Sequence, residues 1–110
     1  MHAYYDKSGN PITFFEALEL KKDPTYFRVR ETTLEDGKWI STVWLGLDHS
    51  FNGQKPLIFE TMVFKDKGLE VLDSKQYTTL EEAEQGHEKV VLKYTAMFHM
   101  EQSLKKDIKN

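Results

Sequence analysis

Residues 41–64 read STVWLGLDHSFNGQKPLIFETMVF and decide the fold of this 110-residue chain. Two runs rich in β-branched and aromatic residues flank a polar loop, a pattern typical of two paired β-strands. The loop carries Asp48 and His49 side by side. The stretch therefore predicts adjacent strands of a sheet, joined by a loop whose side chains can bind ions or transfer protons.

A second hairpin is predicted from the residues before this loop, with strands over 26–34 and 39–47. Asp36-Gly37 lies between them. Asp-Gly between β-prone runs is a strong signal for a two-residue type I′ turn, which requires positive φ at both central residues. This turn sets the register of the hairpin, and a loop one residue longer or shorter would exchange the two faces of a strand.

In that register both faces of the hairpin carry apolar side chains. Arg28 and Arg30 share the face of Trp39, whereas Trp44 lies on the other face with Val29. Antiparallel sheets commonly keep one face polar and in contact with water. We therefore expect either that helices cover both faces or that one face meets a partner.

The later β-prone segments extend the hairpin into a meander. Residues 57–64 predict a third strand, residues 69–72 a short fourth strand, and residues 73–77 a linking segment. Short connections favour antiparallel pairing, because parallel strands need longer crossovers. Residues 3–5 are a candidate for a short fifth strand.

Two helices are predicted from capping boxes, in which a threonine and a glutamate three residues later bond each other's backbone NH groups. Thr13 with Glu16 begins a short helix near the N-terminus. Thr79 with Glu82 begins a helix of about 20 residues, whose apolar residues recur at three- and four-residue steps. We expect this helix to pack across the sheet.

The expected fold is therefore α+β. A mainly antiparallel sheet of about four or five strands is packed by a long C-terminal helix, with a short helix near the N-terminus. Residues 1–100 are expected to form a single domain, followed by a charged, frayed tail over residues 101–110.

Composition narrows the function classes. The hydrophobic fraction is 39%, the formal net charge is -3, and there is no cysteine. The absence of cysteine excludes disulfides, thiolate metal sites and a cysteine nucleophile. No apolar run approaches the roughly 20 residues that span a bilayer, and no basic field predicts binding to nucleic acid or anionic lipid. We expect a soluble, cytoplasmic protein that needs no membrane.

One set of residues could carry chemistry: Asp48, His49, Glu60 and His87. Histidines with carboxylates bind divalent metals or act as general acid and base. These residues lack the spacing of a known metal or catalytic motif, so the catalytic residues stay unknown, and no metal or other cofactor is predicted. The alternatives are that Asp48 caps its loop and that the half-buried His87 ring bonds a strand carbonyl or Glu60.

A second set of residues could bind a partner: Trp39, Phe51, Arg28, Arg30 and His49. Aromatic residues and arginine are the usual anchors of protein interfaces. Core packing is the alternative for the aromatic members. Two arginines could also stack nucleic-acid bases, but in a net acidic chain this reading is weak.

Two stretches resemble a family of short proteins encoded by bacteriophages and prophages. The first is STVWLGLDHSF followed by PLIFETMVF, at residues 41–51 and 56–64, and the second is TLEEA with GHE, at residues 79–83 and 86–88. The loop at residues 52–55 is more polar than the glycine- and proline-rich loop of that family. The resemblance implies a phage accessory gene and implies no reaction, cofactor or catalytic residue.

These observations lead to three hypotheses for function. The first is a small phage or prophage protein in the host cytoplasm that binds a host macromolecule, with a host protein as its partner, as host-takeover or anti-defence proteins such as anti-CRISPR inhibitors do. The second is a metal-binding or acid–base enzyme that uses Asp48, His49, Glu60 and His87. The third is a homodimer that closes over the Trp39 face.

Overall fold

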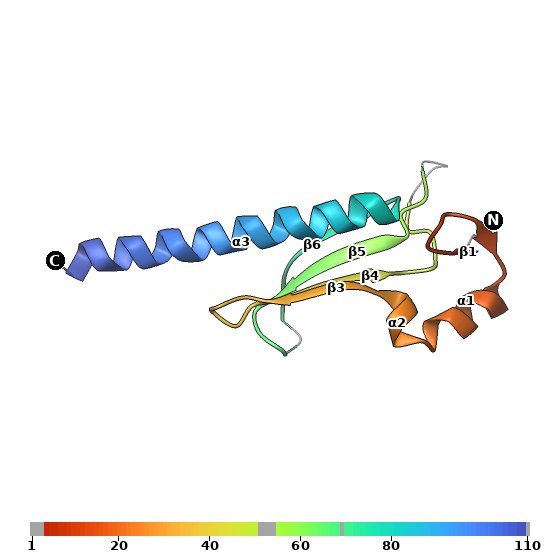
Figure 1. Cartoon of the computed structure of the whole chain (residues 1–110), viewed down its shortest axis with the longest axis horizontal. Coiled ribbons are helices and arrows are strands. Elements are labelled where there is room, and N and C mark those ends of the chain that lie inside the picture. Colours follow the sequence, from red (N-terminus) through yellow and green to blue (C-terminus); the bar gives the residue numbers. More distant parts are fainter. Residues whose placement is uncertain (1–3, 51–54, 69, 110) are drawn as a thin grey trace.

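A four-stranded antiparallel sheet, in the order β3-β4-β5-β6, forms the centre of the molecule in the computed structural model, which describes residues 4–50, 55–68 and 70–109 (Figure 1). The strands are β3 Arg28–Thr33, β4 Trp39–Trp44, β5 Phe59–Phe64 and β6 Val71–Tyr77. Helix α3, Leu80–Lys109, lies along one face of this sheet and projects past it (Figure 1). The predicted α+β fold, an antiparallel meander under a long C-terminal helix, is confirmed.

The N-terminal elements gather at the other end of the sheet (Figure 1). They are β1 Tyr4–Tyr5, β2 Pro11–Ile12, α1 Phe14–Lys21 and α2 Pro24–Phe27. Strands β1 and β2 form a separate two-stranded sheet. It attaches to the chain just after β4, where the Tyr5 NH donates to the Gly46 carbonyl at 2.8 Å.

Both predicted capping boxes are present. Thr13 Oγ1 accepts from the Glu16 NH at 3.1 Å, and the Glu16 carboxylate accepts from the Thr13 NH at 2.8 Å. The same exchange joins Thr79 and Glu82 at 3.1 and 3.2 Å. The helix that follows is longer than predicted, since α3 has 30 residues and continues to Lys109.

The predicted register of the first hairpin is wrong by one residue. Thr33 pairs with Trp39 and Thr32 with Ile40, because the loop contains three residues between Leu34 and Lys38, and the Leu34 NH donates to the Lys38 carbonyl at 2.8 Å. Gly37 supplies the positive φ, 91°, that a three-residue hairpin loop needs at this position.

A β-bulge between Arg28 and Arg30 then shifts the register again. The bulged residue is Val29, and a bulge places an extra residue in one strand so that the strand's faces exchange. As a result Arg30 lies on the α3 side of the sheet, opposite Thr42, and Arg28 lies on the other side, opposite Val43. The prediction that both arginines share the face of Trp39 is therefore wrong.

Strand β6 occupies the segment that was predicted to be a link. Residues 73–77 pair with β5 along its length, from Val63–Asp73 to Phe59–Tyr77. The segment is polar because β6 is one of the two edge strands of this sheet and most of its residues are exposed. Polar residues at an exposed edge conceal the alternation by which a strand is predicted.

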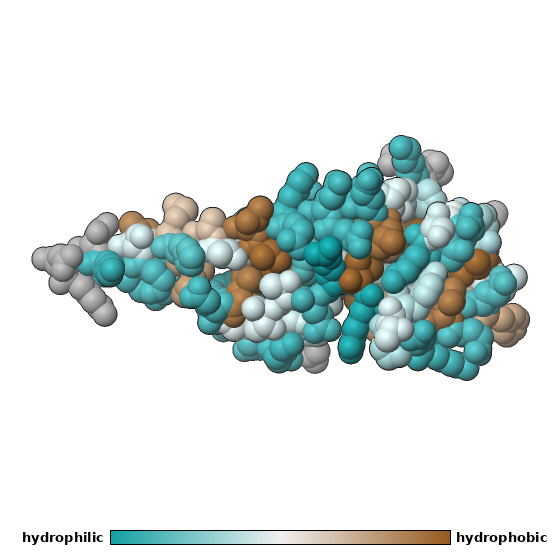
Figure 2. All heavy atoms as spheres, in the orientation of Figure 1, coloured by the Kyte–Doolittle hydropathy of each residue, from teal (hydrophilic) through white to brown (hydrophobic). Residues whose placement is uncertain are grey.

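The core lies between the sheet and the elements packed against it, which are α3 and the N-terminal elements, and a polar layer divides the core. One apolar cluster is built around Trp44 and Phe59, and a second around Ile40, Val63 and Tyr94. Between the two clusters lie three fully buried polar side chains, those of Thr42, Thr61 and His87. The outer surface seen in Figure 2 is mostly hydrophilic, with smaller hydrophobic patches.

Candidate functional site

The face of the sheet opposite α3 is not covered by any helix that the structure describes (Figure 1). We call it the open sheet face. Strand pairing assigns to it alternate residues of all four strands. They are Arg28, Glu31, Thr33, Trp39, Ser41, Val43, Glu60, Met62, Phe64, Val71, Ser74 and Gln76.

Trp39 is the largest side chain of the open sheet face. Its ring stacks on that of Phe64, with centroids 5.0 Å apart and an interplanar angle of 26°. The Trp39 indole NH donates to the Glu31 carboxylate at 3.2 Å, and the Lys67 ammonium lies 4.4 Å from the centre of the ring. These contacts hold a half-buried tryptophan in one orientation, which reduces the entropy that a partner would have to remove.

The rest of the open sheet face combines apolar and charged groups. Met62 and Val43 are half-buried, and Val71 is 44% exposed. Arg28 lies 3.6 Å from the Glu31 carboxylate in an exposed ion pair. Half-buried aromatic and methionine side chains beside arginine are the composition that protein interfaces favour.

The other predicted partner-binding residues lie elsewhere. Arg30 forms an ion pair of 2.9 Å with Glu88 of α3. His49 is exposed in the loop after β4. Phe51 lies outside the described residues. Of the predicted set, the structure places Trp39 and Arg28 together on one surface.

Met62, Phe64 and Lys67 were missed in the prediction of this surface. The signal that could have found them is the alternation within FETMVF, residues 59–64, in which Phe59, Thr61 and Val63 are buried. The residues between the buried ones must then point to the opposite face.

The four residues predicted to carry chemistry are not brought together. Glu60 pairs with Val43 and lies on the open sheet face, where it accepts from the Gln76 amide at 3.4 Å. His87 lies on the opposite side, fully buried beneath α3. The sheet thus separates Glu60 from His87, and the exposed His49 does not share a site with the buried His87 ring.

Asp48 caps its loop, which was the alternative to a chemical role. Its carboxylate accepts from the Ser50 NH at 2.7 Å, the Ser50 hydroxyl at 3.0 Å and the Leu57 NH at 3.0 Å. Burial raises the pKa of Asp48, but these hydrogen bonds outweigh it and leave the pKa below its ordinary value. Asp48 therefore stays ionised and joins the two ends of the loop.

Replacing Asp48 by alanine is expected to lower the free energy of unfolding by about 1–3 kcal/mol, because three donors lose a charged acceptor. Urea denaturation followed by circular dichroism measures the change. Asp66→Ala is the matched control, because Asp66 accepts from the Gly68 NH in an exposed turn and should cost less. Equal stability of Asp48→Ala and the unmodified chain would contradict the capping role.

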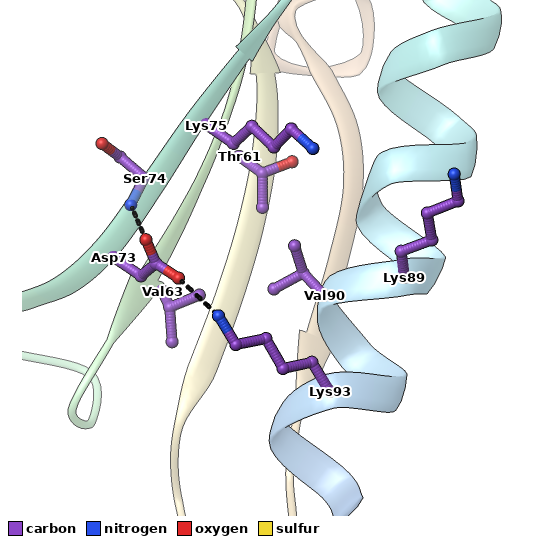
Figure 3. Close-up of a pocket in the computed structure, with 8 residues that line it drawn as sticks. All are labelled: Thr61, Val63, Asp73, Ser74, Lys75, Lys89, Val90 and Lys93. Carbon is purple, nitrogen blue, oxygen red and sulfur yellow. Dashed lines mark hydrogen bonds and ion pairs between the residues drawn. The ribbon is translucent and has the colours of Figure 1, made fainter.

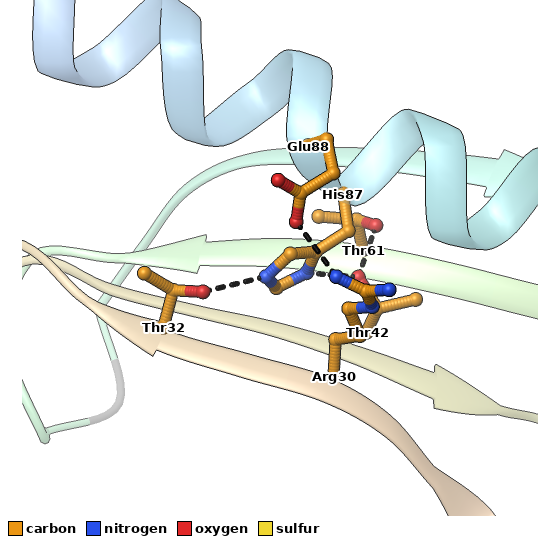
Figure 4. A network of polar contacts seen from close by, with 6 residues as sticks. All are labelled: Arg30, Thr32, Thr42, Thr61, His87 and Glu88. Atoms are coloured by element: carbon orange, nitrogen blue, oxygen red, sulfur yellow. Dashed lines mark hydrogen bonds and ion pairs between the residues drawn. The ribbon is translucent and has the colours of Figure 1, made fainter.

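His87 is the centre of a buried hydrogen-bond network (Figure 4). Its Nε2 lies 2.8 Å from the Thr32 hydroxyl and its Nδ1 2.7 Å from the Thr42 hydroxyl, which in turn bonds Thr61. The partners are hydroxyl groups, not a strand carbonyl or Glu60 as predicted. A hydroxyl can donate or accept, so the neutral ring is satisfied in either tautomer.

The environment of His87 favours the neutral ring. Burial lowers the pKa of His87 below the ordinary value of 6.5, and the neighbouring Arg30 lowers it further, while Glu88 opposes the shift. The ring therefore supports the structure as an uncharged group at neutral pH. A fully enclosed side chain has no room for a substrate, so this network does not provide a catalytic base.

Among the residues that the structure describes, no group of three or more histidine, aspartate or glutamate side chains is placed to hold a metal ion. Within that same part of the chain, no helix has a stretch both long and apolar enough to cross a membrane.

Comparison of the chain with protein-family models, with curated proteins and with solved structures finds no match.

Proposed function

We propose that this chain is a small accessory protein of a phage or prophage that acts by binding a host protein through the open sheet face, without catalysis. The observation that carries the proposal is the stacked pair of Trp39 and Phe64 on a face that no described helix covers. Tryptophan is the residue type that most often dominates the energy of protein interfaces.

The alternative of a metal-binding or acid–base enzyme has less support. Its four residues lie on two sides of the sheet and in a loop, and two of them are already fully engaged in structural hydrogen bonds. A general base must reach the proton that it abstracts. Neither the loop cap Asp48 nor the enclosed His87 offers that access.

The biological setting is proposed from the resemblance of residues 41–51 and 56–64 to phage and prophage proteins. In that setting the protein acts in the host cytoplasm, and inhibition of a host defence system, CRISPR systems among them, is the role we favour. In this proposal the inhibitor acts by occupying a surface of the host protein. Binding then requires a presented surface and no catalytic group.

Trp39→Ala is expected to weaken capture of the host partner at least tenfold, since loss of an interface tryptophan costs about 2 kcal/mol or more. Tagged protein is incubated with lysate of the bacterial host, and retained proteins are quantified by mass spectrometry. Phe15→Ala is the matched control, because Phe15 is an aromatic residue of α1 that is 75% exposed.

The proposal is supported by a host protein that the unmodified chain and Phe15→Ala retain and that Trp39→Ala loses. It fails if Trp39→Ala, with an unchanged circular dichroism spectrum, retains every protein that the unmodified chain retains.

A homodimer that closes over the open sheet face is a related arrangement with the same anchors. Sedimentation velocity over a range of concentrations distinguishes a homodimer from a monomer that binds a host protein. A dimer predicts a rise in sedimentation coefficient with concentration that Trp39→Ala abolishes, whereas a surface kept for a host protein predicts a monomer throughout.

A further inference from the structure

A groove runs between edge strand β6 and helix α3, on the side of the sheet opposite the open sheet face (Figure 3). Its first part is a cavity of about 280 Å³, and a second hollow of about 500 Å³ shares two of its lysines. The first part is lined by Thr61, Val63, Asp73, Ser74, Lys75, Lys89, Val90 and Lys93. The two hollows are both lined by residues of β6 and α3, an arrangement that suits an extended ligand better than a compact one.

The groove contains three lysines and two carboxylates, those of Asp73 and Glu82. The Glu82 carboxylate caps the start of α3, where it accepts from two backbone NH groups at 3.1 and 3.2 Å. The carboxylate of Asp73 is already engaged, since it lies 3.5 Å from the Lys93 ammonium and accepts from the Tyr94 hydroxyl at 3.0 Å. Lys75 and Lys89 line both parts of the groove and form no ion pair within the described part of the chain. The two ammonium groups rise from opposite walls (Figure 3).

The wall that carries Lys75 is the edge of the sheet. Strand β6 pairs with β5 on one side only, and edge strands present unpaired backbone groups. Extended peptides bind to such edges, where the backbone gives affinity and side-chain pockets give specificity. A groove between an edge strand and a helix therefore offers both kinds of contact.

The side chains of the groove favour a peptide over a nucleic acid. Single-stranded nucleic acids bind where exposed aromatic rings stack on their bases. Among the described residues that line the two hollows, the one aromatic residue is Tyr77, which is 7% exposed and packed against Gly86. The chain as a whole also carries a net charge of -3, which opposes a phosphate backbone.

We propose that the groove between β6 and α3 binds an acidic segment of another protein in extended conformation, with its carboxylates held by Lys75 and Lys89. This site does not depend on the open sheet face, because it lies on the other side of the sheet. The groove would bind its ligand through charged side chains, whereas the open sheet face would bind its partner through aromatic ones.

The test uses a fluorescein-labelled peptide of alternating glutamate and threonine, matched in length to the seven residues of β6. Fluorescence anisotropy measures its binding to the full chain at low salt. The double variant Lys75→Glu with Lys89→Glu is expected to bind at least about tenfold more weakly. Lys105→Glu with Lys106→Glu, on exposed positions of α3, applies the same charge change elsewhere and should stay within about twofold.

Lys75→Gln with Lys89→Gln provides a second variant that removes charge without reversing it, and thermal unfolding confirms that each variant is folded. The proposal is overturned if the peptide does not bind to the unmodified chain at about 1 mM protein. It is also overturned if the Lys75→Glu, Lys89→Glu variant binds the peptide as tightly as the Lys105→Glu, Lys106→Glu variant does. It is also overturned if an oligothymidine or the corresponding lysine–threonine peptide binds more tightly.

Discussion

Gly86→Ala is expected to lower the free energy of unfolding by about 1–3 kcal/mol or more, because it overfills a packed core. The direction is opposite to the usual effect, since alanine within a helix is favoured over glycine by roughly 0.5–1 kcal/mol. At this position a Cβ would overlap Cε1, Cζ and Oη of the buried Tyr77 ring. Chemical denaturation followed by circular dichroism measures the change.

Gln85→Ala serves as the matched control, because the neighbouring Gln85 is exposed and its replacement should leave stability almost unchanged. A double-mutant cycle with Tyr77→Leu sharpens the test. In a Tyr77→Leu background the cost of Gly86→Ala should become small, since the overlapping ring is gone. If Gly86→Ala stabilises the unmodified chain, the close approach of α3 to β6 is wrong.

His87 is expected to make the protein sensitive to acid. Its pKa in the folded protein lies below the ordinary value of 6.5, so the unfolded chain binds a proton that the folded one excludes. Stability from the neutral ring is complete above the unfolded pKa and is lost as the pH falls below about 6.5, by at most about 1.4 kcal/mol per pH unit. The loss continues until the pH reaches the folded pKa.

Denaturation curves at a series of pH values between about 5 and 8 measure this slope. His87→Gln is expected to be less stable at neutral pH, because the Thr32 and Thr42 hydroxyls lose their partner, and to lack most of the acid-dependent loss. His49→Gln is the control, since His49 is exposed, and should keep the slope. A slope of the same size in His87→Gln would show that other groups cause it.

The sequence was sufficient for the fold class because strongly patterned segments carry it. The capping boxes at Thr13 and Thr79 predicted helix starts from a local hydrogen-bond exchange that tertiary packing did not alter. The stretch at residues 41–64 predicted two paired strands because its buried residues are β-branched or aromatic. Local chemistry and tertiary packing agree in these segments.

The open sheet face could be predicted only in part, because it depends on the register. A three-residue loop at Asp36-Gly37 and a bulge at Val29 each move side chains from one face to the other. Loop length is not specified by an Asp-Gly pair alone, and a bulge has no reliable signal in a single sequence. Trp39 and Arg28 were therefore predicted on the face where the structure places them, whereas Arg30 was assigned to the wrong face.

The groove between β6 and α3 had no signal in the sequence. Lys75 lies in a segment that was predicted to be a link, and nothing in the sequence singled out Lys89 or Lys93. Their proximity arises from the way α3 lies over the sheet, which Gly86 permits by leaving room for Tyr77. The proximity of these lysines can be predicted only once the order of the strands in the sheet is known.

Photo-cross-linking inside the host cell tests the central claim, binding through the open sheet face, most directly. A photoreactive phenylalanine analogue replaces Met62 on the open sheet face in one protein and Phe15 on α1 in another, and adducts are identified by mass spectrometry after irradiation. Binding through this face should give a discrete adduct with one host protein from position 62 and none from position 15. Equal labelling from both positions, or no adduct from position 62, would contradict it.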